Sequence, residues 1–159
     1  MTKSILIELE SAGEDCFTVF NSGREAIKTF FDRRSELVAD GSKYDTPIDS
    51  LVDLFDCMHQ VNPYIRLGIK NVEVDVDTSV YWLVVGFDKT DDIIYISAHP
   101  TEEEANKKIV SVTRELAAKY KDDKFLKRTS AEIIFNENTI KNGTDYIVFE
   151  TFRTEEVNR

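Results

Sequence analysis

The sequence has few of the residues that define several classes of protein. Its 159 residues include only two cysteines, six glycines and three prolines. Cys16 and Cys57 are too few for a disulfide framework, and their spacing fits no metal-binding pattern. We therefore expect free thiols in a reducing compartment, which predicts a cytoplasmic protein.

Motifs for catalysis and cofactor binding are also missing. The six glycines do not cluster, and neither GxGxxG nor a P-loop occurs. GxSxG and HExxH are absent, and His59 and His99 are the only histidines. These absences favour a non-enzymatic protein and predict neither a cofactor nor a metal site.

Long hydrophobic runs are absent as well. No stretch of about 18 apolar residues occurs, so we expect no membrane span. The opening MTKSILIELE is acidic within ten residues, which is not typical of a signal peptide.

Acidic residues, by contrast, are abundant: 30 against 20 basic residues give a net charge of −10. Such a surface repels phosphate backbones and anionic lipid. A protein partner is therefore favoured over nucleic acid or membrane. An alternative is an acidic mimic of nucleic acid, in which rows of carboxylates imitate phosphates.

The hydrophobic periodicity predicts one α+β domain over 1–153, followed by a frayed tail over 154–159. Three helices are expected, one after each of two capping boxes, Ser22–Glu25 and Thr101–Glu104, and one after Pro47. The order ββα-α-βββα-ββ implies a mainly antiparallel sheet of six to seven strands with the helices largely on one face. Strands are expected over 4–10, 15–20, 72–77, 81–87, 92–97, 131–135 and 145–152.

The stretch from Trp82 to Tyr120 organises this prediction. It consists of two strands and a capped amphipathic helix, and 81–87, apolar on both faces, is expected to be the central strand. Residues 4–38 repeat the pattern at an offset of 79, which places Ser22 on Thr101 and Glu25 on Glu104. Gene duplication and the recurrence of a common local unit both explain the match.

Two charged segments are the main candidates for function. Residues 107–128 contain eight basic and three acidic residues, a net charge of +5, so the remainder carries −15. Glu73, Asp75 and Asp77 alternate along a predicted strand and could bind a divalent cation or form a solvated strand face. The residues expected to bind a partner are Lys119, Lys121, Lys124, Lys127, Arg128, Glu73, Asp75 and Asp77.

The leading functional prediction is therefore a regulatory protein that binds another protein through a charged surface. Nucleic acid would bind, if at all, through the basic segment 107–128, and a homodimer is a third arrangement. The second prediction is a small-molecule or nucleotide-binding module, with or without hydrolytic activity, built around the aromatic strand and His99. The Phe-, Tyr-, Asp- and Lys-rich composition resembles that of accessory or inhibitor proteins of large bacterial viruses.

Overall fold

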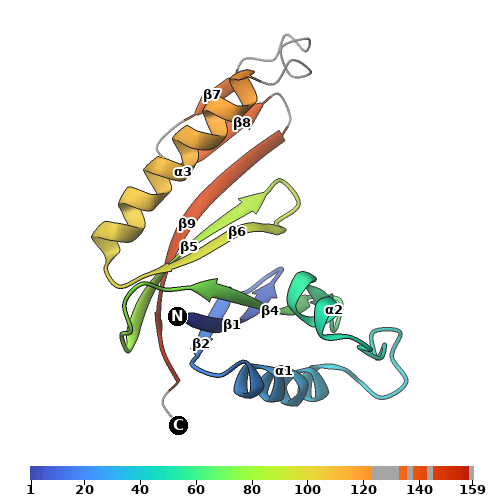
Figure 1. Cartoon of the computed structure of the whole chain (residues 1–159). Coiled ribbons are helices and arrows are strands. Elements are labelled where there is room, and N and C mark those ends of the chain that lie inside the picture. Colours follow the sequence, from blue (N-terminus) through green and yellow to red (C-terminus); the bar gives the residue numbers. More distant parts are fainter. Residues whose placement is uncertain (123–132, 136–137, 143–144, 158–159) are drawn as a thin grey trace. The chain divides into compact units, whose positions relative to one another are not determined.

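The chain forms two compact units, one of Met1–Val80 with Thr154–Arg159 and the other of Tyr81–Arg153. The computed structural model describes residues 1–122, 133–135, 138–142 and 145–157, and these contain nine strands and three helices (Figure 1). The α+β class and the three helices are thus confirmed. The single sheet of six to seven strands is wrong, because the described strands form one sheet of four and another of five.

The first unit has the strand order β2-β1-β4-β3, with antiparallel neighbours. Its strands are β1 (Thr2–Glu10), β2 (Cys16–Phe20), β3 (His59–Gln60) and β4 (Ile65–Glu73). Helices α1 (Gly23–Leu37) and α2 (Leu51–Asp56) contribute to one buried core with the sheet. That core contains Leu6, Phe20, Ala26, Phe30, Leu54, Val61, Leu67 and Ile69.

The second unit has the order β6-β5-β9-β8-β7. It consists of β5 (Val80–Asp88), β6 (Ile93–His99), α3 (Glu102–Asp122), β7 (Ile133–Phe135), β8 (Thr139–Asn142) and β9 (Asp145–Glu155). The predicted central strand is confirmed, since β5 lies between two neighbours and its residues 83–87 are all buried. Its Val84 packs with Ala105, Ile109 and Val112 of α3. These residues follow the helical period that predicted the buried side of α3.

The two units share one order of elements. Each begins with a hairpin and a helix, β1-β2-α1 or β5-β6-α3, and each ends with a hairpin, β3-β4 or β8-β9. The last strand then lies beside the first, which gives the matching orders β2-β1-β4-β3 and β6-β5-β9-β8. The two units therefore share a longer order of elements than the strand–strand–helix pattern that the offset of 79 relates in the sequence.

The C-terminal segment differs from the predicted frayed tail over its described residues. Strand β9 continues to Glu155, and Thr154 and Glu156 are both buried at 8% exposure. The Thr154 hydroxyl donates to the Phe17 carbonyl at 2.7 Å, and the Val157 amide donates to the Val19 carbonyl at 2.9 Å. These bonds to β2 hold the segment in the first unit. Residues 158–159 lie outside the described part.

Two strands differ from the expected ones. Strand β4 covers 65–73 rather than 72–77, and β8 lies between the two strands expected at 131–135 and 145–152.

Candidate partner-binding surfaces

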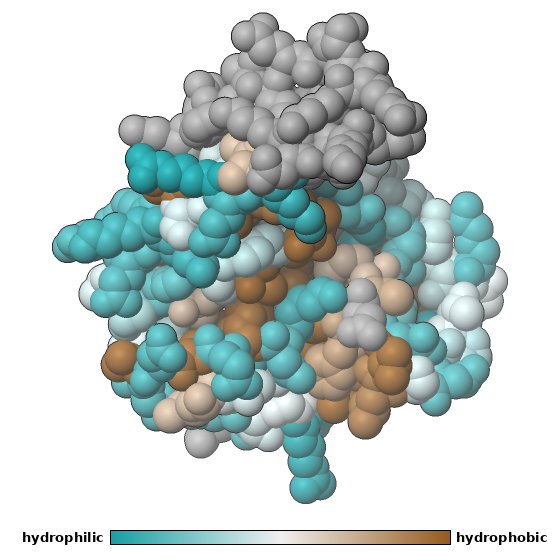
Figure 2. Space-filling view, turned by 45° about the horizontal axis from the view of Figure 1, so that its top comes forward, coloured by the Kyte–Doolittle hydropathy of each residue, from teal (hydrophilic) through white to brown (hydrophobic). Residues whose placement is uncertain are grey.

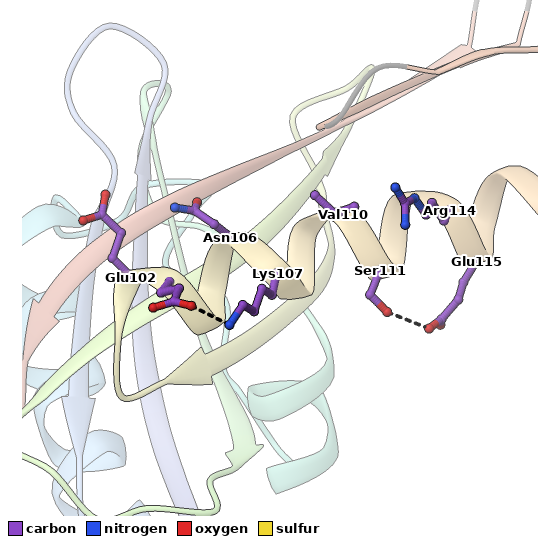
Figure 3. Close-up of a pocket in the computed structure, with 8 residues that line it drawn as sticks. Glu102, Asn106, Lys107, Val110, Ser111, Arg114 and Glu115 are labelled. Carbon is purple, nitrogen blue, oxygen red and sulfur yellow. Dashed lines mark hydrogen bonds and ion pairs between the residues drawn. The ribbon is translucent and has the colours of Figure 1, made fainter.

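One side of α3, in the second unit, borders an open space of about 880 Å³, and the lining residues all belong to this helix. Its walls include Glu102, Asn106, Lys107, Val110 and Arg114, whose spacing places them along one side of the helix (Figure 3). Of these, only Val110 is apolar, and the others are exposed. The opposite side of α3 packs on the sheet, so this face presents polar groups on a rigid 21-residue helix.

Charges along α3 are distributed unevenly. The first turn holds three glutamates, and Glu103 accepts from Lys107 at 2.5 Å (Figure 3). Further along, the exposed Arg114 and Lys119 form no ion pair with any residue in the described part of the chain. The C-terminal half of α3 therefore presents positive charge that is not neutralised within those residues.

The predicted basic site is only partly within the described structure. Lys119 is exposed near the end of α3. Lys121 belongs to the last turn of the same helix, and its side chain is not described. Lys124, Lys127 and Arg128 lie outside the described residues.

The predicted acidic residues Glu73, Asp75 and Asp77 do not lie on one face of a strand. Strand β4 ends at Glu73, so Asp75 and Asp77 follow it in a bend. Asp77 accepts from the ammonium of Lys3 at 2.7 Å, and Asp75 is exposed. Among the residues that the structure describes, no group of three His, Cys, Asp or Glu side chains could hold a metal ion.

Glu73 is also engaged within the first unit. Its carboxylate accepts from the Thr2 hydroxyl at 2.5 Å and pairs with the terminal ammonium of Met1 at 3.3 Å. The hydrogen bond from Thr2, and then that from the ammonium, hold the pKa of Glu73 below its usual value. Of the three predicted carboxylates, Glu73 and Asp77 therefore bond within the first unit, whereas the Asp75 side chain forms no hydrogen bond or ion pair with the described residues.

The second unit contains one juxtaposition that the sequence prediction missed. Ser97 and His99 point to the same side of β6, and the Ser97 hydroxyl lies 2.9 Å from Nε2 of His99. The sequence contains a signal for this contact, because a serine and a histidine two positions apart on a strand lie on the same side. A hydroxyl and an imidazole at this distance are the first two members of a nucleophile–base arrangement.

Other exposed groups on the described surface include single thiols and apolar side chains. Cys16 and Cys57 are free and exposed. Figure 2 shows one face of the molecule, with hydrophilic side chains around the outside and apolar side chains gathered toward the middle and lower right. The exposed apolar side chains include the neighbours Leu51 and Val52 of α2, and Tyr64, each more than 60% exposed.

Comparisons with known proteins return no relative: no protein-family model, no curated protein and no solved structure matches this chain. None of the helices in the described residues combines the length and apolar character needed to cross a membrane.

Proposed function

We propose that this is a non-enzymatic interaction protein that binds an acidic surface of another protein through α3. The observation that carries the proposal is the pair of exposed cations in the C-terminal half of α3, Arg114 and Lys119, neither of which has a carboxylate partner in the described residues. They lie five positions apart, so they point in different directions around the exposed part of the helix. The sequence continues the positive charge through Lys121, Lys124, Lys127 and Arg128.

Cations of the first unit are used differently. Arg33 binds Glu8 through two hydrogen bonds, at 2.9 and 2.7 Å, and Lys3 is buried against carboxylates. Those charges stabilise the fold and are not available to a partner. Arg114 and Lys119 have no such role, so their replacement should change binding without changing the structure.

The overall charge of −10 does not prevent this interaction. At physiological ionic strength, the Debye length is about 8 Å, so exposed charges farther apart than this are largely screened. Contact with a partner is then governed by the charges close to the interface. Because this contribution is electrostatic, binding should weaken as salt is added.

The test compares two pairs of charge reversals. Arg114→Glu with Lys119→Glu changes α3, and Arg24→Glu with Lys28→Glu makes the same charge change on exposed residues of α1. Proteins retained from a source-cell lysate by the wild-type chain are identified at low and raised salt, and their affinity is then measured with purified components. We expect the α3 pair to weaken binding at least several-fold and the α1 pair to leave it unchanged.

Two results would contradict the proposal. One is a partner whose affinity does not depend on salt or on the α3 pair. The other is a partner that is lost with the α1 pair instead, which would assign binding to the first unit.

A further inference from the structure

A second pocket, of about 290 Å³, lies entirely within the first unit. Three segments form it: the last part of α1 through Arg34, the loop after α1 through Lys43, Tyr44 and Ile48, and the start of β3 through Met58 and His59. Figure 1 shows how the loop after α1 leads back to α2, which brings these segments together. No feature of the sequence pointed to this pocket.

The charges that line the pocket have one sign. Arg34 and Lys43 are cationic, and no aspartate or glutamate is among the described lining residues. The first unit as a whole contains 17 acidic and 9 basic residues, a net charge of −8. The Asp45 carboxylate lies beside the pocket and offsets part of the Arg34 charge, so the attraction for an anion comes from Lys43 and from the unpaired edge of the Arg34 guanidinium.

The guanidinium of Arg34 is held in place by hydrogen bonds at one nitrogen, and its other nitrogens can still donate to a ligand. Its Nη2 donates to the Thr46 carbonyl at 2.6 Å and lies 3.4 Å from the Asp45 carboxylate. The side chain is only 15% exposed, so these bonds hold it in one position. All its recorded partners in the described residues are at Nη2, which leaves the donors of Nε and Nη1 for a ligand.

The other polar groups are also available. Lys43 Nζ lies 4.8 Å from the centre of the Tyr44 ring and forms no ion pair in the described part of the chain. His59 Nε2 is 2.8 Å from the Asp53 carbonyl. A carbonyl only accepts, so Nε2 carries the proton and Nδ1 remains to bond a ligand hydroxyl. Ile48 and Met58 add apolar surface beside these groups.

We infer that this pocket binds a small phosphate monoester. A phosphate monoester carries about −1.5 to −2 charges at pH 7, and its oxygens can accept hydrogen bonds from both cations. The planar fork of a guanidinium suits two phosphate oxygens, and the lysine adds a point charge. Ligand sites usually begin at about 300 Å³, so the organic part must be small and in contact with Ile48 and Met58. This site is independent of the binding proposed for α3.

The experiment titrates the ¹⁵N-labelled full chain with inorganic phosphate and with ethyl phosphate, a monoester with a small apolar group, against sodium chloride at equal ionic strength. We expect saturable shifts of the backbone amides of residues 43–46, 48 and 58–60, and tighter binding of ethyl phosphate than of phosphate. Lys43→Gln should weaken binding about tenfold, because one charge-assisted hydrogen bond is lost. Lys28→Gln, an exposed change on α1 outside the pocket, should leave the affinity unchanged.

The wild-type titration tests the site without depending on any variant. Absence of saturable shifts at millimolar phosphate, or shifts centred on other residues, would overturn the inference. Equal affinities of the Lys43→Gln and Lys28→Gln chains would overturn it too. Failure here leaves the α3 proposal intact, since Arg114→Glu with Lys119→Glu does not alter this pocket.

Discussion

The ammonium of Lys3 lies 3.0 Å from Oε2 of Glu156, although 153 positions separate the two residues. Lys3 is completely buried, and its other partners are Asp77 Oδ1 at 2.7 Å and Asn21 Oδ1. An ammonium has three donors, and here each has an acceptor. A buried charge is tolerated only when it is paired in this way, so Lys3 joins β1 to three distant parts of the first unit.

Replacement of Lys3 should therefore be strongly destabilising. Lys3→Met leaves the buried Glu156 carboxylate without its cation, and breaking a buried pair costs about 3–5 kcal/mol. Chemical denaturation measures the loss, and Lys28→Met on the exposed side of α1 should cost less than about 0.5 kcal/mol. Adding Glu156→Met to Lys3→Met should recover part of the stability. Equal stability of the Lys3→Met and Lys28→Met chains would show that the pair contributes nothing.

Glu73 supplies a prediction about pH. Its pKa is lower in the folded protein because the Thr2 hydroxyl and the Met1 ammonium donate to the carboxylate. A lowered folded pKa contributes stability that is present above the unfolded pKa and is lost as pH falls through the folded value. NMR titration of the side-chain carboxyl should give a midpoint below that of an ordinary glutamate. Thr2→Ala should move the midpoint upward; an unchanged midpoint would assign the shift to the ammonium alone.

Gly86 of β5 has no space for a side chain. A Cβ atom there would lie 2.8 Å from Cε1 of Phe149 and 3.1 Å from Cβ of Tyr95. Phe149 is 1% exposed, so its ring has little room to move. Gly86→Ala should cost about 1–3 kcal/mol in unfolding free energy. Gly23→Ala is the matched control: its Cβ would meet only Ser4 Oγ, at 3.4 Å, and alanine suits a helix. Equal effects of the two changes would contradict this account.

Local sequence predicted the helices well but not every detail of their ends. Both capping boxes mark a helix start, at Gly23 and Glu102. Thr101 Oγ1 accepts from the Glu104 amide at 3.2 Å as expected, whereas the Ser22 side chain makes no capping bond. The capping box thus forms its hydrogen bond at the start of α3 but not at the start of α1, where no backbone amide bonds to the hydroxyl.

Strand β4 shows why the sheets were harder to predict. Ile65, Leu67 and Ile69 alternate with polar residues or glycine, while Val72 and Val74 follow in the opposite phase. The alternation in the sequence predicts a strand for the second phase only, over 72–77. In the structure, Leu67 and Ile69 belong to the core with α1 and α2, and Val72 is buried on the other face of the same strand. A strand that is buried on both faces shows two alternations of apolar residues, one on odd and one on even positions. From the sequence alone, these alternations can belong to one strand or to two.

The candidate sites depend even more on distant residues. The charge balance of 107–128 was visible in the sequence, and it led to the exposed Lys119 on α3. Asp77 was assigned to a partner-binding face, yet it binds Lys3 from 74 positions away. The pocket of Arg34, Lys43 and His59 likewise depends on how a loop folds back on α1. Contacts between residues far apart in the chain leave no periodic pattern in the sequence, so they could not be predicted from it.

Two threonines provide a matched pair for the cost of a buried hydroxyl. Thr113 of α3 is 1% exposed, and within the described residues its Oγ1 is the one buried side-chain polar atom without a hydrogen bond. Thr154 is also buried, but its hydroxyl donates to the Phe17 carbonyl at 2.7 Å. Valine has nearly the same shape as threonine, so each Thr→Val change chiefly removes the hydroxyl.

Opposite effects are expected at the two positions. Thr113→Val removes an unsatisfied polar group and should stabilise the protein by about 1 kcal/mol, since valine and threonine have similar helix propensity. Thr154→Val leaves the Phe17 carbonyl without its donor and should destabilise it by about 1–3 kcal/mol. Denaturant midpoints at unchanged m-values measure both changes. If Thr113→Val destabilised the protein as much as Thr154→Val, the Thr113 hydroxyl must have a partner, such as the carbonyl one turn earlier in α3.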